Sequence, residues 1–320
     1  MIKQPRVSRC ELHQLADRLS QRDWNILHFI NRHRYATTGQ LRRLYFATHA
    51  SQSAATRACT RVLGRLLKLR LLTRLERRIG GDRHGSAAFI WCLDVVGERL
   101  QRLADGKRRR FHEPSFLFLQ HSLAITDIHV QLVEAERTGC FNLIQVAIET
   151  EAWRPYLTPH GVTTLLKPDM MISLANHAYR DYWYLEVDLA SESLPVLMRK
   201  CHAYEDYRHT GQAQQEHQVF PRVLWVMPTP ERITRVKTAI AADRTDSSSS
   251  PPQRRSFLHS ENRRNQNPIT PIRKPSRKEA WLSMKTHKPR RQVSATPANQ
   301  FRAIIQGVRA FGGALARSMT

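Results

Sequence analysis

Charge is separated along this chain of 320 residues, and that separation decides which parts can build a folded core. Residues 1–110 contain 24 basic and 8 acidic side chains, whereas residues 111–243 contain 11 basic and 16 acidic ones. Residues 244–320 contain 16 basic and 3 acidic side chains and are rich in Ser, Pro and Asn. A segment of that last composition has too little apolar surface to fold alone. We therefore expect two folded units, 1–110 and 111–243, followed by a flexible basic tail, 244–320.

The net charge, the cysteines and the apolar runs indicate what kind of partner and which cell compartment to expect. A formal net charge of +24 predicts a polyanionic partner, and the acidic middle segment could bind cations. Five cysteines are far apart and form no Cys-x-x-Cys pair, which argues against a zinc finger and indicates a reducing compartment. No apolar run reaches the roughly 18 residues of a membrane span, and Met1–Cys10 does not resemble a signal peptide. We expect a cytoplasmic protein without a membrane span.

The basic head has the pattern of a winged helix-turn-helix. Ser20 followed by Asp23 predicts a helix start, because both side chains can cap free backbone N–H groups. A second, short helix is expected after Thr38, and a longer third helix from about Ser53. The rest of the head predicts a strand, a Gly-rich turn, a second strand and a closing helix, at residues 71–78, 80–81, 87–93 and 94–104.

Basic side chains gather on the two elements that touch DNA in a winged helix. Those on the third helix recur every three or four residues: Arg57, Arg61, Arg65 and Lys68. The hairpin adds Arg77, Arg78 and Arg83. The functional interpretation is that the third helix enters the major groove and the hairpin contacts phosphates or the minor groove of double-stranded DNA. The alternatives are a solvated basic face or a module that binds protein.

The acidic middle predicts an α+β fold with the order helix, three strands, helix, strand, helix. Residues 116–137 show the spacing of a long helix, and Gly139 is suited to end it. The later elements are expected at residues 141–148, 165–174, 182–189, 194–209, 219–227 and 230–241.

Carboxylates fall at the ends of two of these strands. Lys167-Pro168-Asp169 opens the second strand, and Glu186 and Asp188 end the third on one face, because strand side chains alternate. Such carboxylates repel each other unless they are solvated or bind a cation. Mg²⁺ or Mn²⁺ prefers oxygen ligands of this kind and can prepare a nucleophile for attack on a phosphodiester. The alternative for Asp188 is a solvent-facing strand end.

This middle segment resembles the PD-(D/E)XK restriction-endonuclease-like fold. The matching features are Pro168-Asp169, the Glu-x-Asp at Glu186 and Asp188 that begins seventeen residues later, and the order of elements from about 116 to 241. The family usually has Lys where this chain has Asp188, and that Lys polarises the nucleophile or the phosphate. Lys200 on the next helix, or Lys167 beside the motif, could replace it. Without a replacement the site would bind metal or DNA without cutting.

The whole arrangement resembles the replication-relaxation family of plasmids and integrative elements, over roughly residues 20–241. The resemblance rests on a winged helix, a helix beginning His121-Ser-Leu-Ala-Ile, the Lys-Pro-Asp motif, Leu-Glu-Val-Asp-Leu-Ala-Ser-Glu-Ser at 185–193, and Lys200 with Tyr204 and Tyr207 downstream. The family is related to the C-type mobilisation relaxases. The resemblance implies action at a plasmid or element origin, with Asp169, Glu186 and Asp188 as an acidic triad that binds metal. The predicted catalytic set is these three residues with Lys200 and His121.

Other residues have weaker interpretations. His121 is equally a satisfied helix histidine, Glu149 and Glu151 are solvated or additional ligands, and Tyr204 is expected to pack. Relaxases with a tyrosine nucleophile need a His-apolar-His metal motif, which the chain lacks. It also lacks the phosphate-binding loop of ATP-driven motors.

The tail and the function remain open between alternatives. The tail is a DNA-binding arm or a solubilising segment, and residues 299–319 predict a basic amphipathic helix for another transfer or replication protein. One functional hypothesis is a metal-dependent origin-nicking endonuclease or relaxase. The second is a replication or transcription factor with an inert nuclease-like domain. A third is an RNA-binding protein.

Overall fold

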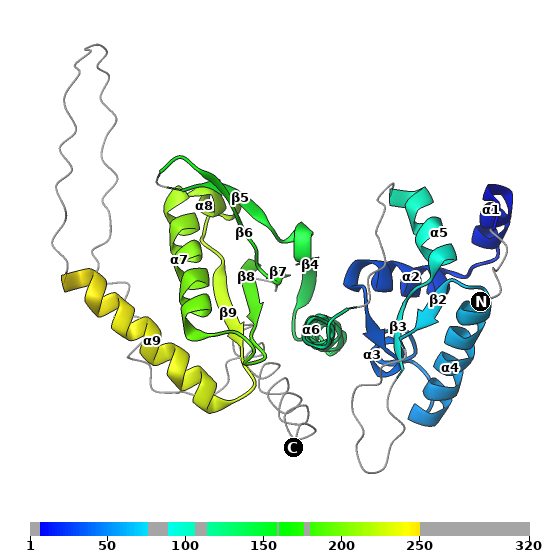
Figure 1. The fold of residues 1–320 in the computed structure, drawn as a ribbon. Coiled ribbons are helices and arrows are strands. Elements are labelled where there is room, and N and C mark those ends of the chain that lie inside the picture. The colour runs from blue at the N-terminus through cyan, green and yellow to red at the C-terminus, as the bar shows by residue number, and fades with distance from the viewer. Residues whose placement is uncertain (1–6, 76–88, 106–113, 159, 176–179, 250–320) are drawn as a thin grey trace.

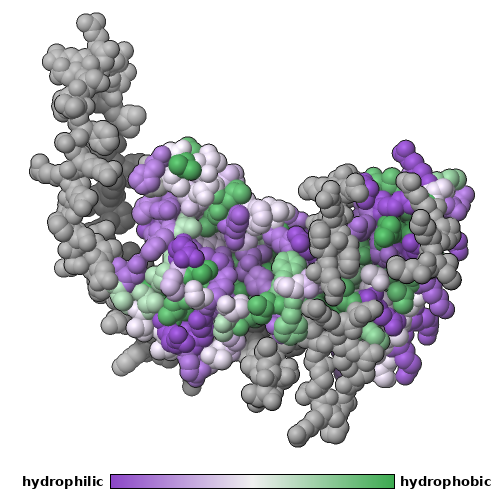
Figure 2. All heavy atoms as spheres, viewed as in Figure 1, coloured by the Kyte–Doolittle hydropathy of each residue, from purple (hydrophilic) through white to green (hydrophobic). Residues whose placement is uncertain are grey.

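A computed structural model describes residues 7–75, 89–105, 114–158, 160–175 and 180–249. Two halves lie on either side of one long helix, α6, which Figure 1 shows almost end-on between them. On the face shown in Figure 2, hydrophilic side chains spread over both halves, with smaller hydrophobic patches between them. The expected basic tail helix at 299–319 lies outside the described residues.

The head combines helices with a small antiparallel sheet. Its strands lie in the order β1-β3-β2, and both pairs are antiparallel. The elements in chain order are α1 Arg9–Asp17, α2 Gln21–His33, β1 Ala36–Thr37, α3 Thr38–Tyr45, α4 Gln52–Lys68, β2 Leu72–Arg74, β3 Ile90–Leu93 and α5 Val95–Asp105. The expected helices and both expected strands are confirmed, with β2 and β3 shorter than predicted, whereas α1 and β1 were not predicted. The expected turn at 80–81 lies outside the described residues.

Side-chain caps explain where the first helices of the head begin. Ser20 and Asp23 form the predicted reciprocal capping box, in which each side chain accepts a bond from the other residue's backbone N–H. The same box forms at the start of α1 and of α3. The signal for α1, Ser8 followed by Glu11, is therefore present in the sequence, although its apolar residues are too few to show a strong period.

The second half is built on a four-stranded sheet in the order β4-β7-β8-β9, with only the last pair parallel. A separate two-stranded hairpin pairs β5 with β6. The elements are α6 Phe116–Arg137, β4 Asn142–Ile148, a 3-10 turn Glu149–Glu151, β5 Arg154–Leu157, β6 Thr163–Leu166, β7 Met170–Ala175, β8 Arg180–Val187, α7 Leu194–Thr210, α8 Gln212–His217, β9 Arg222–Val226 and α9 Pro230–Ser249. The expected α+β class is confirmed, but the expected order of helix, three strands, helix, strand, helix was incomplete, because the hairpin strands β5 and β6 and the short helix α8 are additional.

Helices cover both faces of this sheet. Ile125, Ile128 and Leu132 of α6 pack with one set of strand side chains, including Ile172 and Leu185. On the other face, the tyrosines of α7 pack against a second set of strand side chains, which includes Ala147, Met171 and Tyr184. The polar residues at the ends of β7 and β8 therefore lie between two helices.

Two predicted boundaries were wrong. The strand expected at 165–174 is interrupted at residues 167–169 and divides into β6 and β7. Pro168 lies at the interruption, where its missing N–H cannot support a strand ladder. Helix α9, expected to end at residue 241, continues to Ser249 and so includes residues 244–249, which the sequence assigned to the flexible tail.

Helix α6 belongs to the cores of both halves. Val130 is part of the main head core, and Leu119 and Leu123 pack with Tyr35 and Ile90 of the head. The expected boundary between residues 110 and 111 lies in the stretch 106–113, outside the described residues. Helix α6, which that boundary assigns to the second unit, completes the packing of the first.

This double packing explains the apolar composition of α6. Among the described residues, α6 is long and apolar enough to count as a candidate membrane span by length and composition alone, which is weak evidence for a span. In this structure 56% of its most apolar window is buried. A helix that packs on both sides needs apolar residues around most of its circumference.

Candidate active site

Asp169 is held at the start of β7 by the neighbouring strand. Its backbone N–H donates to the carbonyl of Leu185 (3.2 Å), and the backbone N–H of Val187 donates to its Oδ2 (2.7 Å). The side chain is 16% exposed. The Lys-Pro-Asp motif thus places a carboxylate beside the end of β8, as the sequence predicted.

His121 reaches the same carboxylate from α6. Its Nε2 lies 3.2 Å from Oδ2 of Asp169, and about a third of its side chain is exposed. Burial lowers the pKa of His121, but the hydrogen bond and the negative charge of Asp169 outweigh it, so this pKa lies above its ordinary value. His121 is therefore part of a polar site that opens to solvent.

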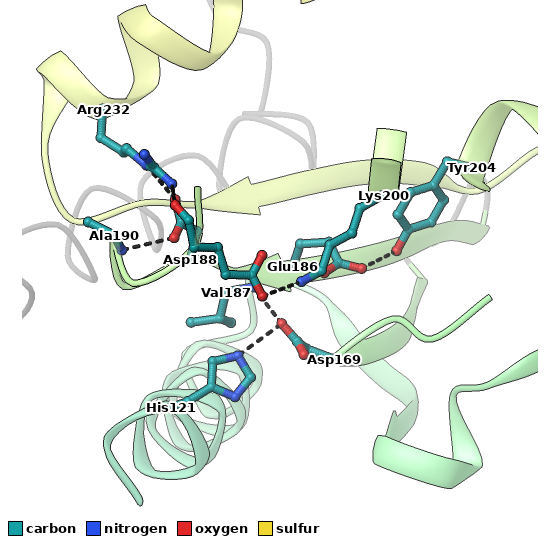
Figure 3. A network of polar contacts seen from close by, with 10 residues as sticks. His121, Asp169, Glu186, Val187, Asp188, Ala190, Lys200, Tyr204 and Arg232 are labelled. Atoms are coloured by element: carbon teal, nitrogen blue, oxygen red, sulfur yellow. Dashed lines mark hydrogen bonds and ion pairs between the residues drawn. The ribbon is translucent and has the colours of Figure 1, made fainter. Parts of the chain in front are cut away.

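Glu186 is the buried carboxylate of the site, and Figure 3 shows its partners. Tyr204 donates its hydroxyl to Oε1 (2.7 Å), and Lys200 donates from Nζ to Oε2 (3.1 Å). Burial and the nearby charge of Asp169 raise the pKa of Glu186 to about 7, against the opposing effects of Lys200 and Tyr204. The expectation that Tyr204 only packs was incomplete, because its buried hydroxyl positions this carboxylate.

Lys200 is the lysine that reaches the site, where the sequence suggested that Lys200 or Lys167 could replace the lysine missing at position 188. It contacts Glu186 and also lies 3.1 Å from Oε1 of Glu192, with about a third of its side chain exposed. Burial lowers the pKa of Lys200, but these carboxylates raise it overall, so Lys200 stays charged. The other candidate, Lys167, lies instead over the ring of Trp153, 5.0 Å from its centroid.

Asp188 does not join the other two carboxylates, which corrects the predicted acidic triad. Its Oδ2 accepts from Nε of Arg232 (2.7 Å) and its Oδ1 from the N–H of Ala190 (2.9 Å). The side chains of Asp188 and Arg232 are 1% and 9% exposed. Figure 3 shows Asp188 turned toward Arg232, away from Lys200 and Tyr204. Because β8 ends at Val187, the alternation of faces does not extend to Asp188.

The remaining carboxylates fit Mg²⁺ or Mn²⁺ only as a two-ligand set. In the described part of the chain, no three His, Cys, Asp or Glu side chains gather closely enough to hold a metal ion. Mg²⁺, however, is commonly held by one or two carboxylates and keeps several waters. Asp169 and Glu186 have this chemistry and lie close enough for the charge of one to raise the pKa of the other.

The predicted DNA-binding residues divide into three groups. Arg57, Arg61 and Lys68 are exposed on α4. Arg65 is half-exposed and binds the buried carboxylate of Asp23 (2.5 Å), so it also joins α4 to α2. The hairpin residues Arg77, Arg78 and Arg83 lie outside the described residues.

Sequence reasoning missed the role of the carboxylates after β4. Glu149 binds Arg34, and Glu151 binds Arg32, each at 2.6 Å, so these acids contact the head; Glu151 is also exposed to solvent, as expected, whereas Glu149 is only partly exposed. A third pairing joins Arg43 to Asp127 (2.7 Å) and to Glu134 of α6. The opposite net charges of residues 1–110 and 111–243 were the feature of the sequence that could have predicted ion pairs between the two halves.

Comparison with known proteins gives one match. The sequence model of the Replication-relaxation family matches residues 27–223. This range includes most of α2, all of α6, the Lys-Pro-Asp motif and the helix that carries Lys200 and Tyr204. No curated protein and no solved structure matched the chain.

Proposed function

The chain belongs to the replication-relaxation family, and from this premise we propose that it is a metal-dependent, origin-nicking endonuclease of the relaxase type. The family indicates a role in mobile-element replication or relaxation, with DNA as the partner. The observation that carries the finer proposal is the contact of Lys200 with Glu186, beside Asp169 and His121. Two carboxylates, a fixed cation and a histidine form a set suited to phosphodiester hydrolysis.

In this proposal the head binds duplex DNA as a winged helix. The exposed cations Arg57, Arg61 and Lys68 lie on α4, the third helix of the expected motif. Opposite charges and hydrogen bonds attach the head to α6, so bound DNA and the carboxylates belong to one packed unit.

Each site residue has a separate task. Asp169 and Glu186 would hold Mg²⁺ or Mn²⁺, which supplies an activated oxygen nucleophile and stabilises the leaving oxygen. Lys200, charged and partly exposed, would neutralise developing negative charge on the phosphate. His121 holds Oδ2 of Asp169, and Tyr204 holds Oε1 of Glu186, so each carboxylate has a fixed orientation.

The test is nicking of a supercoiled plasmid that carries the native origin, with Mg²⁺ or Mn²⁺ and with EDTA. We expect open circles only with metal, and at least a 100-fold loss of rate in Asp169→Asn with origin binding unchanged. The matched control is Asp181→Asn, because Asp181 is 17% exposed at the other end of β8 and pairs with Arg222. Equal nicking by Asp169→Asn and the native protein would refute the assignment.

A second candidate is a replication or transcription factor whose nuclease-like half is inert. It is favoured by the commitment of Asp188 to Arg232, which leaves fewer carboxylates for metal. This candidate predicts sequence-specific binding in EDTA and no scission in Mn²⁺. Reproducible scission that Asp169→Asn abolishes would exclude it.

A further inference from the structure

We propose that Arg34 and Glu149 form a positioning pair, which connects the head to both elements that carry the Asp169–His121 contact. The inference rests on the proposed function, since it concerns how that site is held. Arg34 immediately follows α2 in the head, and Glu149 immediately follows β4 in the second half. Their side chains meet with Nη2 of Arg34 at 2.6 Å from Oε2 of Glu149.

On the first side of the link, Glu149 contacts the segment that carries Asp169. The backbone N–H of Glu149 donates to the backbone carbonyl of Asp169 (3.3 Å). A shift of Glu149 would therefore also shift the backbone at Asp169, and with it the orientation of the Asp169 carboxylate.

On the second side of the link, Arg34 contacts the helix that carries His121. The guanidinium carbon of Arg34 lies over the ring of Phe118, 5.6 Å from its centroid. Phe118 precedes His121 by three residues on α6, a spacing at which side chains are neighbours. The guanidinium of Arg34 thus contacts both Glu149, which is bonded to Asp169, and Phe118, which neighbours His121 on α6. Asp169 and His121 are the two partners of the 3.2 Å contact in the site.

The backbone at both members of the pair is unusual. Arg34 has φ of 67° and Glu149 has φ of 47°, the left-handed region that side chains with a Cβ rarely adopt. Such conformations persist where surrounding contacts hold them, and they gather at functional sites. Two residues with this uncommon backbone meet through one ion pair, so the contacts around both of them hold the pair in place.

The consequence for the reaction is a dependence of turnover on this link. Small displacements of a reacting group slow a reaction strongly, because the groups must be held near their reactive arrangement. Loss of the pair would let Asp169 and His121 move relative to each other, while the DNA-binding residues of α4 stay unchanged. Turnover should fall and DNA affinity should remain.

The chain provides a matched control in the neighbouring pair. Arg32 and Glu151 also join the head to the 3-10 turn, with two guanidinium nitrogens on the carboxylate. Arg32 precedes Arg34 by two residues and also donates to the backbone carbonyl of Val146 in β4, so Arg32→Ala removes at least as many contacts across the interface as Arg34→Ala. A general loosening of the interface would affect both variants.

The first experiment measures steady-state nicking by Arg34→Ala, Glu149→Gln, their double variant and Arg32→Ala. We expect Arg34→Ala and Glu149→Gln each to lower kcat about tenfold with KM within twofold, and the double variant to be no worse than either. Arg32→Ala should stay within twofold of the native protein. Equal losses in Arg32→Ala and Arg34→Ala, or full activity in Arg34→Ala, would overturn the proposal.

The second experiment needs no nicking and so separates this inference from the proposed function. The backbone N–H of Val187 donates to Oδ2 of Asp169, so its hydrogen exchange reports how firmly that carboxylate is held. We expect exchange at Val187 at least fivefold faster in Arg34→Ala and Glu149→Gln, and unchanged in Arg32→Ala. Unchanged exchange in the first two variants would refute the pair's role. Faster exchange in a protein that never nicks would keep the positioning pair and reject the nuclease.

Discussion

At the scale of single residues, the partner of each carboxylate decides what it can do. Asp169 lies just before β7, and Glu186 and Asp188 lie at the end of the neighbouring strand β8. Each carboxylate nevertheless accepts hydrogen bonds from a different set of donors. Asp169 keeps a partly exposed side chain beside a histidine, whereas Asp188 is enclosed with a guanidinium. The first is suited to chemistry and the second to holding α9 against the end of the sheet.

The enclosed position of Asp188 predicts that its partner Arg232 stabilises the fold. Arg232→Ala should lower the free energy of unfolding by about 3–5 kcal/mol, because it leaves Asp188 buried without its charged partner. Urea unfolding followed by circular dichroism would measure this loss. The control is Arg235→Ala, an exposed arginine on the same helix, which should change the unfolding free energy by less than about 0.5 kcal/mol. A loss below about 1 kcal/mol in Arg232→Ala would contradict the structural role.

At the scale of elements, α4 presents a basic face whose members are not equivalent. Arg57, Arg61 and Lys68 are exposed, while Arg65 contacts the cap residue Asp23 of α2. Charge on this helix therefore contributes to the packing of the head through Arg65, and in our proposal the exposed members also bind DNA. The sequence spacing predicts that all four basic residues lie on one face of α4. Only the packing of α2 against α4 shows that Arg65 differs from the other three, because it pairs with Asp23.

For the exposed arginines we predict a loss of non-specific electrostatic affinity. The double variant Arg57→Ala/Arg61→Ala should weaken binding to all duplex sequences and reduce the slope of log K against log salt by about 2, because each phosphate contact contributes nearly one unit. Fluorescence anisotropy over a salt series measures this slope. Arg235→Ala/Lys237→Ala removes the same charge from exposed positions of α9 and should leave the slope unchanged. Equal slopes in both variants would show that α4 does not contact DNA.

The same titration separates DNA from RNA as the partner. A helix that reads the major groove cannot enter the deep, narrow groove of duplex RNA. Binding of duplex RNA as tight as that of duplex DNA at matched salt would contradict a groove-reading α4.

At the scale of the whole molecule, α6 makes the two halves interdependent. It contributes to both cores, and its His129 lies 2.7 Å from His33 of α2 through facing ring nitrogens. Gln40 of α3 also donates to the carbonyl of Leu123 on α6 (3.0 Å). The halves should therefore unfold together rather than as separate domains.

The histidine pair predicts acid sensitivity of this interface. Burial and the charges of His129 and Arg32 lower the pKa of His33 well below its ordinary value. Burial and Arg32 lower the pKa of His129 to about 4, against the effect of Glu151. Both pKa values lie below the unfolded value of about 6.5, so the unfolded chain binds more protons in acid. Stability from this pair is complete above about pH 6.5 and falls as the pH drops toward 4.

Urea unfolding at pH 7.5, 6 and 5 would measure this loss. Below pH 6.5 the buried His33 alone should contribute a slope approaching about 1.4 kcal/mol per pH unit. His33→Gln should flatten the dependence, whereas substitution of His202, an exposed histidine paired with Asp243, should not. The same slope in native protein and His33→Gln would refute the prediction.

Much of the secondary structure was determined by local sequence. Helices α2, α3, α4, α6 and α7 follow from apolar spacing and capping residues, and these signals act within a few residues of chain. Lys-Pro-Asp and Glu186 predicted two carboxylates of the site, because neighbouring carboxylates at strand ends repel each other unless they are solvated or bind a cation. The family resemblance was carried by the same local motifs.

Only the tertiary structure decided which charges meet. Asp188 pairs with a residue 44 positions away, Glu149 with one 115 positions away, and Lys200 reaches Glu186 from the next helix. The sequence determined which elements form and what charge each carries, since both depend on neighbours along the chain. The pairing of those charges depends on how the helices lie against the sheet, and long-range packing sets that arrangement.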